Sequence, residues 1–541
     1  MHSCKSKDMG VNLVVFLFLL LSISLASVAA QVDHGDWVKT ERPDSDYELE
    51  VTFAIKRTNP GWLKDKLRAV SYPDSPEYGN YMNFDEIAKY VHGNPESVQA
   101  LVSTLGHAGI GRDKIDLTIG QEFAIVKIPV QTAEELFSAD FYIFQHKEKT
   151  EQKVIKTDSY TIPNTLQGHI DFVSGIAEFP RPNIIFPRKS TSTNSVGVTP
   201  KSIETDYNIS DYVSTEPNNS QAIASFLKQY FNPTDLETFQ MEFDVPKNPI
   251  AKIVGKNIAD MPGVEAELDV QYITATGRKV TTWFVSTSTY ANKGQEDFLS
   301  WIIGQVNDTT SPWVHSVSYG DYENSIPTDY QDRCDSEFMK FGISGRTILI
   351  ATGDEGVHCK RQKFVPTWPT CSPYVTAVGG TASLTKVWQF GGGGFSNTYT
   401  MPDYQKEAVQ AYLSSGKAPP TSYFNTSGRA YPDISAFSTN YQVVIDALPQ
   451  PVDGTSCSTP TSAGIVAILN DVRMKNGKKT LGFLNPLLYS LKGKGFIDIT
   501  SGKNSGGGAF SCPGFQATAG WDPASGWGSP NFGLLKDLVL Q

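Results

Sequence analysis

The chain contains few of the residues that most often bind metals or serve as catalytic bases. Its 541 residues include 8 histidines and 6 cysteines, and no two cysteines form the C-x-x-C pair typical of zinc sites. Lys and Arg number 46 against 57 Asp and Glu, which gives a formal net charge of -11. This acidic balance argues against nucleic acid or an anionic membrane surface as a partner. Internal repeats and low-complexity runs are also absent.

Long apolar runs are missing except near the N-terminus. Residues 11–30 are nearly all apolar or small, follow Lys5 and Lys7, and end in Val28-Ala29-Ala30, a small-residue pattern that suits signal peptidase. We therefore predict a signal peptide over residues 1–30, with an uncleaved membrane anchor as the alternative. Cleavage would leave a protein of the secretory pathway without a membrane segment.

Loss of the signal peptide removes Cys4 and leaves five cysteines. In an oxidising compartment, two disulfides and one free thiol are the natural arrangement for that number. The residues themselves do not determine which cysteines pair. Four N-x-S/T sequons, all beyond residue 200, are typical of a secreted glycoprotein: Asn208, Asn218, Asn307 and Asn425.

The composition predicts a globular protein of at least two domains, because hydrophobic residues make up 40% and charged residues 19% of a long chain. In the first part, predicted strands at 47–55 and 123–128 alternate with predicted helices at 60–70 and 95–108. This mixture indicates a small α+β domain of the ferredoxin-like kind. The polar stretch 188–195 has no periodicity and is typical of an exposed linker.

Beyond the linker, apolar strands alternate with helices. Strands are expected at 280–287, 314–318, 348–351 and 375–378, and helices at 222–230, 264–273, 297–307 and 329–344. This alternation predicts an α/β domain with a parallel sheet that helices cover on both faces. Catalytic groups would then gather at the carboxyl ends of the strands.

One serine has the setting of an acyl-transfer nucleophile. Ser456 follows Gly454 and precedes the apolar run 463–469, so its hydroxyl would lie near the positive end of a helix dipole. An ordinary helix cap is the alternative. The nucleophile needs a base, and beyond the linker only His315, within a predicted strand, and His358, next to a cysteine, are available. A carboxylate base, which works best in acid, is the other possibility.

Two segments supply candidate carboxyl groups. Glu265 and Asp269 are one helical turn apart among apolar neighbours, so they can share a proton, whereas Glu267 is expected on a solvated face. Asp354 follows the buried strand 348–351 in a tight Gly-Asp-Glu-Gly turn. The alternatives are an exposed, mildly repulsive helix pair and a turn aspartate bonded to its own backbone. The apolar neighbours favour a functional pair, because burying two acids is costly without a task.

Three motifs together resemble the sedolisin family of serine-carboxyl peptidases, and within it the tripeptidyl-peptidase branch: Gly454-Thr455-Ser456, the Glu265–Asp269 helix and Thr352-Gly353-Asp354. The resemblance extends over nearly the whole chain after the signal peptide. It implies a subtilisin-like catalytic domain over residues 195–541. It also implies a propeptide domain over residues 31–194, which acts as an intramolecular inhibitor and is cut off near residues 193–195.

The resemblance also implies a Ser-Glu-Asp mechanism. Ser456 would attack the peptide carbonyl while Glu265, oriented by Asp269, takes its proton. Asp354, protonated, would donate to the oxyanion, which requires acid or a raised pKa. The implied activity is acid-activated release of tripeptides from free N-termini of peptides and unfolded proteins, in a lysosome or an acidic extracellular space. An endopeptidase of the same family and a non-catalytic binding glycoprotein are the alternatives.

One Ca²⁺ ion and two disulfides are further implications of the resemblance. The calcium ligands would be two carboxylates and three main-chain carbonyls, an all-oxygen set that suits this cation: Asp498 and Asp522, with Ile499, Thr518 and Gly520. The disulfides would join Cys359 to Cys512 and Cys334 to Cys371, and Cys457 would stay free.

Overall fold

The computed structural model describes residues 34–148, 150, 152–179, 188–189, 197–287, 298–506 and 512–541. The predicted signal peptide, most of the predicted linker and the predicted cleavage position lie outside the described residues. Within the described part, none of the helices combines the length and the apolar character needed to cross a membrane.

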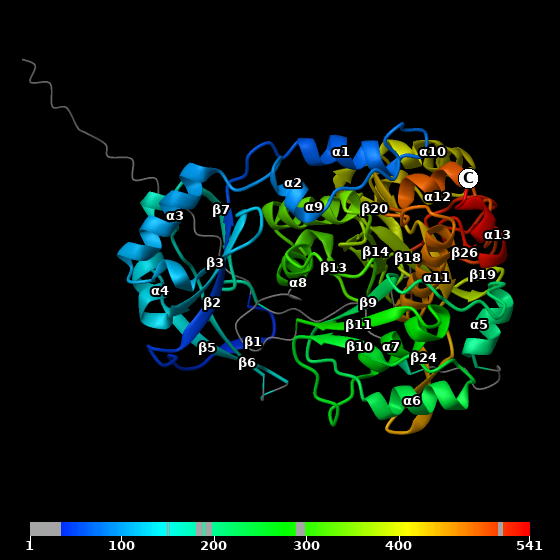
Figure 1. Cartoon of the computed structure of the whole chain (residues 1–541), viewed down its shortest axis with the longest axis horizontal. Helices are drawn as coiled ribbons and strands as arrows, with labels where there is room; N and C mark the ends of the chain where they lie inside the picture. The colour runs from blue at the N-terminus through cyan, green and yellow to red at the C-terminus, as the bar shows by residue number, and fades with distance from the viewer. Residues whose placement is uncertain are drawn as a thin grey trace, which may run out of the picture.

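The N-terminal part, blue to cyan in Figure 1, is built on a four-stranded antiparallel sheet. Its strands lie in the order β3 (Ile115–Leu117), β4 (Phe123–Pro129), β2 (Glu48–Ile55) and β7 (Ile170–Ser174). Helices α3 (Pro95–His107) and α4 (Val130–Phe137) share a hydrophobic core with this sheet. A smaller sheet contains β1 (Trp37–Lys39), β5 (Phe141–His146) and β6 (Lys153–Thr157). The predicted small α+β domain is confirmed.

The remainder of the chain is built around an eight-stranded sheet. Its order is β10 (Ile250–Val254), β11 (Thr281–Ser286), β9 (Ser220–Ser225), β12 (Val314–Val317), β14 (Thr347–Ala351), β18 (Thr376–Ser383) and β19 (Lys386–Val387), and β22 (Ile434–Phe437) also pairs with β18. Only β19 runs antiparallel to its neighbour among these described strands. Strands β12 and β14 are buried along their whole length, as expected for a parallel sheet covered on both faces.

Side chains of the sheet alternate between two hydrophobic cores. Along β14, Leu349 belongs to the core that includes helices α7 (Val264–Thr276) and α11 (Thr455–Lys475). Its neighbours Ile348 and Ile350 belong to the core that includes α8 (Phe298–Val306) and α9 (Thr328–Ile343). Helices therefore cover both faces of the sheet, and the predicted α/β fold is confirmed.

Shorter elements complete this part of the molecule: β8 (Arg188–Lys189), α5 (Pro200–Asp206), α6 (Pro233–Glu242), β13 (Asp321–Tyr322), β15 (Cys359–Lys360), β16 (Lys363–Phe364), β17 (Thr367–Trp368), β20 (Gly394–Thr400), α10 (Lys406–Ser414), β21 (Gly428–Tyr431), β23 (Tyr441–Ile445), β24 (Leu448–Asp453), α12 (Asn485–Leu491), β25 (Phe496–Ile497), β26 (Ser529–Pro530) and α13 (Phe532–Leu538).

The prediction of a helix at 222–230 is wrong, because this segment forms β9 and the turn after it. Ala222 and Ala224 face one hydrophobic core and Ile223 faces the other, which is the two-residue period of a strand. A short apolar run is compatible with either a buried strand or a buried helix. Pairing with β11 and β12 on both sides decides the outcome here.

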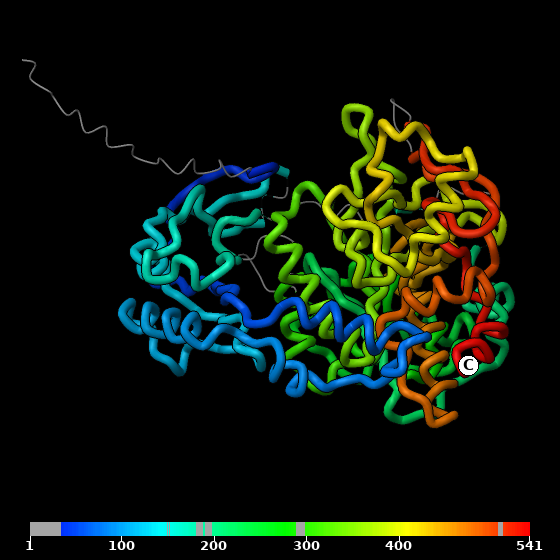
Figure 2. The backbone as a smooth tube through the Cα atoms, turned by 90° about the horizontal axis from the view of Figure 1, so that it is seen from above, coloured from blue at the N-terminus to red at the C-terminus, as the bar shows by residue number. Residues whose placement is uncertain are grey.

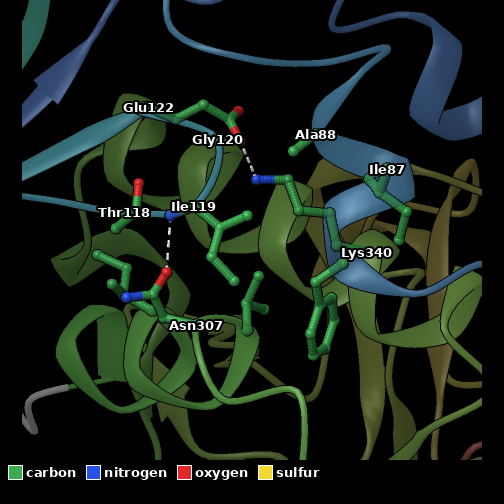
Figure 3. Close-up of a pocket in the computed structure, with 11 residues that line it drawn as sticks. Ile87, Ala88, Thr118, Ile119, Gly120, Glu122, Asn307 and Lys340 are labelled. Atoms are coloured by element: carbon green, nitrogen blue, oxygen red, sulfur yellow. Dashed lines mark hydrogen bonds and ion pairs between the residues drawn. The ribbon is translucent and has the colours of Figure 1, made fainter.

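The N-terminal part packs along the C-terminal part, residues 197–541, through α1 (Trp62–Ser71) and α2 (Phe84–Ala88), which lie over it in Figures 1 and 2. Leu63 and Phe84 belong to the same hydrophobic core as α8 and α9. Polar contacts join the two parts as well. In Figure 3 the Lys340 amino group of α9 points to Glu122, and Ile119 N donates to Asn307 Oδ1 over 2.7 Å.

Candidate active site

Three elements bring the predicted catalytic side chains together. Ser456 is the second residue of α11, so it lies at the positive end of a 21-residue helix. Glu265 and Asp269 lie in α7, and Asp354 lies in the turn after β14. Helices α7 and α11 approach closely at Gly464, where a Cβ would come within 2.1 Å of Thr276 Oγ1.

The carboxyl groups of Glu265 and Asp269 are both about 1% exposed. Asp269 Oδ1 accepts a hydrogen bond of 2.9 Å from Ser318 Oγ. Burial raises the pKa of Glu265 well above its ordinary value, and the nearby charges of Asp269 and Asp354 raise it further. Burial also raises the pKa of Asp269, although the hydrogen bond from Ser318 partly lowers it. The pair is therefore arranged to hold protons at pH values where exposed carboxyl groups are ionised.

The Ser456 hydroxyl faces this acid pair. It is buried and is one of the influences that lower the pKa of Glu265, so the two groups are close. Their alignment falls short of a hydrogen bond, since Ser456 Oγ and both carboxyl oxygens of Glu265 have no hydrogen-bond partner among the described residues. A nucleophile and its base are often loosely aligned until substrate is bound.

Neither histidine beyond the linker forms a hydrogen bond with the Ser456 hydroxyl. His315 is buried with Nε2 bonded to Pro312 O at 3.0 Å, and burial lowers its pKa to about 3. His358 instead contacts Glu355 and Tyr322. The geometry therefore offers Glu265, and not a histidine, as the group that can accept the serine proton.

Asp354 is joined directly to the start of the serine helix. Its Oδ1 accepts hydrogen bonds from Thr455 N at 2.7 Å and from Thr455 Oγ1 at 2.9 Å. Gly353 N in turn donates to Thr455 Oγ1 at 3.1 Å. The turn needs a glycine before the aspartate, because Gly353 has a φ of 102°. This network fixes the Asp354 carboxyl group beside the backbone of the nucleophile.

Glu267 is not on a solvated face, so that expectation is wrong. Its side chain is fully buried, and its carboxylate accepts hydrogen bonds from Asn232 N at 2.6 Å and Gln271 Nε2 at 3.1 Å. Helix α7 is enclosed by α6, α11 and β23, which leaves no side of it open to solvent. Burial raises the pKa of Glu267 to about 8.

Two residues of the predicted linker, the strand β8, lie at this site. Strand β8 pairs antiparallel with β24, and Arg188 stands opposite Asp453, close in sequence to the nucleophile. Arg188 Nη2 donates to Asp354 O over 2.6 Å, and the guanidinium lies 5.1 Å from the centre of the Phe390 ring.

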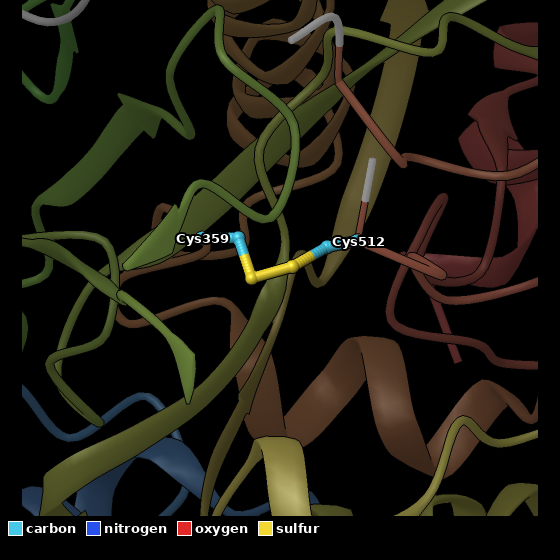
Figure 4. The surroundings of a disulfide bond; sticks show 2 residues. All are labelled: Cys359 and Cys512. Atoms are coloured by element: carbon cyan, nitrogen blue, oxygen red, sulfur yellow. A yellow bond between two sulfur atoms is a disulfide. The ribbon is translucent and has the colours of Figure 1, made fainter. Parts of the chain in front are cut away.

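One of the two expected disulfides is present. Cys359 and Cys512 are bonded (Figure 4), which links the loop after Asp354 to the C-terminal segment. The prediction of a bond between Cys334 and Cys371 is wrong, because both cysteines are free and buried. Cys371 Sγ instead donates to Glu323 Oε1 over 3.2 Å. Cys457 is free, as expected.

The predicted calcium ligands lie on two neighbouring segments, 498–499 and 518–522. Asp498 Oδ2 accepts from Gly520 N, and Asp522 Oδ2 accepts from Thr518 N, both at 2.8 Å. Burial raises the pKa of Asp498, and it raises the pKa of Asp522 to about 7. In the described part of the chain, no three His, Cys, Asp or Glu side chains gather as a metal cluster. A buried carboxylate and an exposed one, with main-chain carbonyls nearby, still fit a hard cation that accepts oxygen ligands.

Two residues of the site were not predicted from the sequence. Ser318, which bonds Asp269, directly follows the buried strand β12, and Thr455, which bonds Asp354, precedes the nucleophile. A polar residue at the carboxyl end of a buried parallel strand is the signal that could have identified Ser318.

Comparisons with known proteins agree with this arrangement. Residues 35–179 match the family "Pro-kumamolisin, activation domain", and residues 286–481 match the "Subtilase family". The chain is 40% identical to tripeptidyl-peptidase 1 of Mus musculus over 93% of this chain and 94% of that protein. For tripeptidyl-peptidase 1 of Homo sapiens, the identity is 39% with the same coverage.

A solved structure of Pseudomonas sedolisin, a serine-carboxyl proteinase, matches 64% of this chain and 98% of its own, with 23% identity and a TM-score of 0.51. At this identity the likeness shows the fold. The sequence identity to complete relatives shows the family: the chain belongs to the tripeptidyl-peptidase 1 family of serine peptidases, with an activation domain before a subtilisin-like catalytic domain.

Proposed function

We propose that this enzyme removes tripeptides from the free N-termini of peptides and unfolded proteins. Ser456 attacks the carbonyl carbon of the scissile bond, and Glu265 takes the hydroxyl proton and later gives it to the leaving amine. Water then hydrolyses the acyl-enzyme by the same route in reverse. The observation that carries this proposal is the buried Glu265 carboxyl group beside Ser456, at a site where neither histidine is in contact.

Asp269 and Asp354 have supporting roles in this proposal. Asp269, held by Ser318, lies one turn from Glu265 and shares the proton of the buried pair. Asp354 donates from its protonated carboxyl group to the oxyanion of the tetrahedral intermediate. A carboxyl group can donate a hydrogen bond only while it is protonated, so activity requires acid.

The activation domain is proposed to hold the enzyme inactive until it is removed. The match over residues 35–179 and the contact of Arg188 with Asp354 O support an intramolecular inhibitor that reaches the site. The apolar N-terminal segment supports entry into the secretory pathway, and the acid requirement supports a lysosome or another acidic compartment as the place of action.

Calcium is proposed as a structural ion. The carboxylates of Asp498 and Asp522 would hold it, with the carbonyls of Ile499, Thr518 and Gly520. When bound, the cation would neutralise the two carboxylates and cross-link the two C-terminal segments that carry them. A chelator such as EGTA is expected to lower the midpoint of thermal unfolding, and added calcium should restore it. A midpoint that chelation does not change would contradict the site.

Product analysis tests the proposed activity. Peptides of identical sequence with a free or an acetylated N-terminus are incubated at pH 4.5 with the processed enzyme, and products are identified by mass spectrometry. Tripeptides released one after another from the free peptide, with the acetylated peptide intact, support the proposal. Internal cleavage of both peptides at equal rates would favour an endopeptidase of the same family.

A further inference from the structure

The loop that follows Asp354 carries a charged cluster outside the catalytic groups. Glu355, the next residue, contacts His358 Nδ1 through Oε2 at 2.8 Å. The Tyr322 hydroxyl also bonds Glu355 Oε2, and its ring stacks on His358 with the ring centres 4.3 Å apart. Glu355 is 43% exposed, so this carboxylate is accessible and its position is held by two neighbours.

This carboxylate is ionised over the whole pH range in which the enzyme is proposed to work. The hydrogen bonds from His358 and Tyr322 lower the pKa of Glu355 to about 2, although partial burial alone would raise it. Both of these bonds use Oε2, and Oε1 accepts none among the described residues. One oxygen of a fixed anion is therefore left for a further cation.

A cation carried by β8, Arg188, already lies near the Glu355 carboxylate. The charge of Arg188 is one of the influences that lower the pKa of Glu355. The same guanidinium donates to Asp354 O and lies over the Phe390 ring. Phe390 is tied to this loop, because Gly356 N donates to Phe390 O over 2.7 Å. A carboxylate, a carbonyl and an aromatic face are three groups that commonly recognise cations together.

The segment that carries Arg188 binds as an extended peptide. It pairs through its backbone with β24, the strand that leads to the nucleophile. Addition of a strand to an exposed edge is a common way for proteins to hold peptides, with side-chain pockets that give specificity. A substrate peptide on the same edge would bring a group of its own to the position of the guanidinium.

We propose that Glu355, the Phe390 ring and the Asp354 carbonyl form a subsite for a positively charged group of the peptide substrate, which Arg188 occupies in the precursor. The group is an ammonium or guanidinium, supplied either by the substrate N-terminus or by a Lys or Arg side chain. This assignment rests on the proposed peptidase function and makes Glu355 a determinant of specificity.

The test compares kcat/KM for matched peptides with processed wild type and Glu355→Gln. One series carries arginine or its neutral analogue citrulline at each of the three residues before the cleaved bond. A second series carries a free N-terminus or its desamino analogue. Glu237→Gln, which removes an exposed carboxylate paired with Lys247 on α6, is the matched control.

Glu355→Gln should reduce kcat/KM for the cationic peptide roughly 5- to 30-fold, and Phe390→Leu should act in the same direction. In the series that varies the bound group, the neutral partner peptide should change by less than about twofold, which also shows that the variant is folded, and Glu237→Gln should change neither peptide. If Glu355→Gln no longer distinguishes the arginine peptide from the citrulline peptide, the ligand is a side chain. If it no longer distinguishes the free N-terminus from its desamino analogue, the ligand is the N-terminal amine.

An equal loss for the charged and the neutral peptide in both series, or no loss in either series, would overturn the subsite and leave the peptidase function standing. If processed wild type cleaved no peptide at all, the proposed function would fall first and this subsite with it.

Discussion

At the scale of single residues, burial supplies most of the proposed chemistry. Glu265 and Asp269 are acids with almost no contact with water, and Ser318 is the one described side chain that donates to the pair. Without solvent, each acid resists ionisation, and each charge raises the pKa of its neighbour. The same loss of solvent makes Glu265 basic enough to take a proton from Ser456 in acid.

Asp354→Asn tests whether a protonated carboxyl group serves the oxyanion. An asparagine keeps an oxygen for the two hydrogen bonds from Thr455 and adds an N–H donor that does not titrate. We expect activity at pH 4 to fall by no more than about tenfold and the decline toward neutral pH to weaken. Rates of tripeptide release between pH 4 and 7 provide the measurement. A decline as steep as that of wild type would mean that another group sets the acid requirement.

Glu267→Gln tests a buried acid that has no proposed catalytic role. The pKa of Glu267 rises from 4.5 to about 8 in the folded protein, so folding stabilises its protonated form. That stabilisation is complete below pH 4.5 and is lost as the pH rises toward 8, with a slope of up to about 1.4 kcal/mol per pH unit. Denaturant unfolding at pH 4.5, 6 and 7.5 should show a shallower decline for the variant. An unchanged slope would contradict the assignment.

At the scale of elements, the sequence predicts what is local and fails where distant segments decide. The Glu265–Asp269 pair was identified because a helix places residues four apart on one face, and Asp354 because a glycine turn follows an apolar strand. The sequence of β9 predicts a helix as readily as a strand, because only its two neighbouring strands distinguish the alternatives. Likewise, the sequence does not predict the burial of Glu267, because the elements that enclose α7 come from distant parts of the chain.

Helix α9 shows the same limit, because its role at the domain interface cannot be inferred from its own sequence. Arg333 donates to Ile55 O and Glu122 O at 2.8 Å and to Asp171 Oδ2 at 2.7 Å. Lys340, two turns along, contacts both Glu122 and Glu337. Burial raises the pKa of Glu337, although the charge of Lys340 lowers it. The Glu337–Lys340 pair lies within α9, whereas the Lys340–Glu122 pair joins the two parts of the molecule.

Lys340→Met should weaken the attachment of the activation domain. It leaves the carboxylates of Glu122 and Glu337 buried without their cation, at a cost of about 3–5 kcal/mol. Removal of the propeptide should then run at least roughly tenfold faster than in wild type at a fixed pH, as followed by gel electrophoresis.

The matched control is Arg68→Ala, because the Arg68–Asp403 pair joins the same two parts of the molecule but is 59% exposed on both sides. An exposed pair contributes about 0–1 kcal/mol, so processing should be unchanged. The specific activity of the mature enzyme should equal that of wild type in both variants. Equal processing of Lys340→Met and wild type would contradict a role for the buried pair.

At the scale of the whole molecule, the chain has the architecture of a latent precursor. The N-terminal part shares a hydrophobic core with the catalytic part, and a strand near residue 188 reaches the active-site turn. Ser456, Glu265 and Asp354 are all buried in this state. Latency and acid chemistry therefore belong to one account, in which the site becomes active once the activation domain is removed and acid supplies the protons of the buried carboxyl groups.

The most direct test of this account is tripeptide release from a free N-terminal peptide between pH 3 and 8, after acid incubation, with Ser456→Ala beside wild type. The account predicts activity confined to acid, a loss of at least about a thousandfold in the variant, and no activity before processing. An optimum near neutral pH would indicate a histidine base and contradict the roles of Glu265 and Asp354.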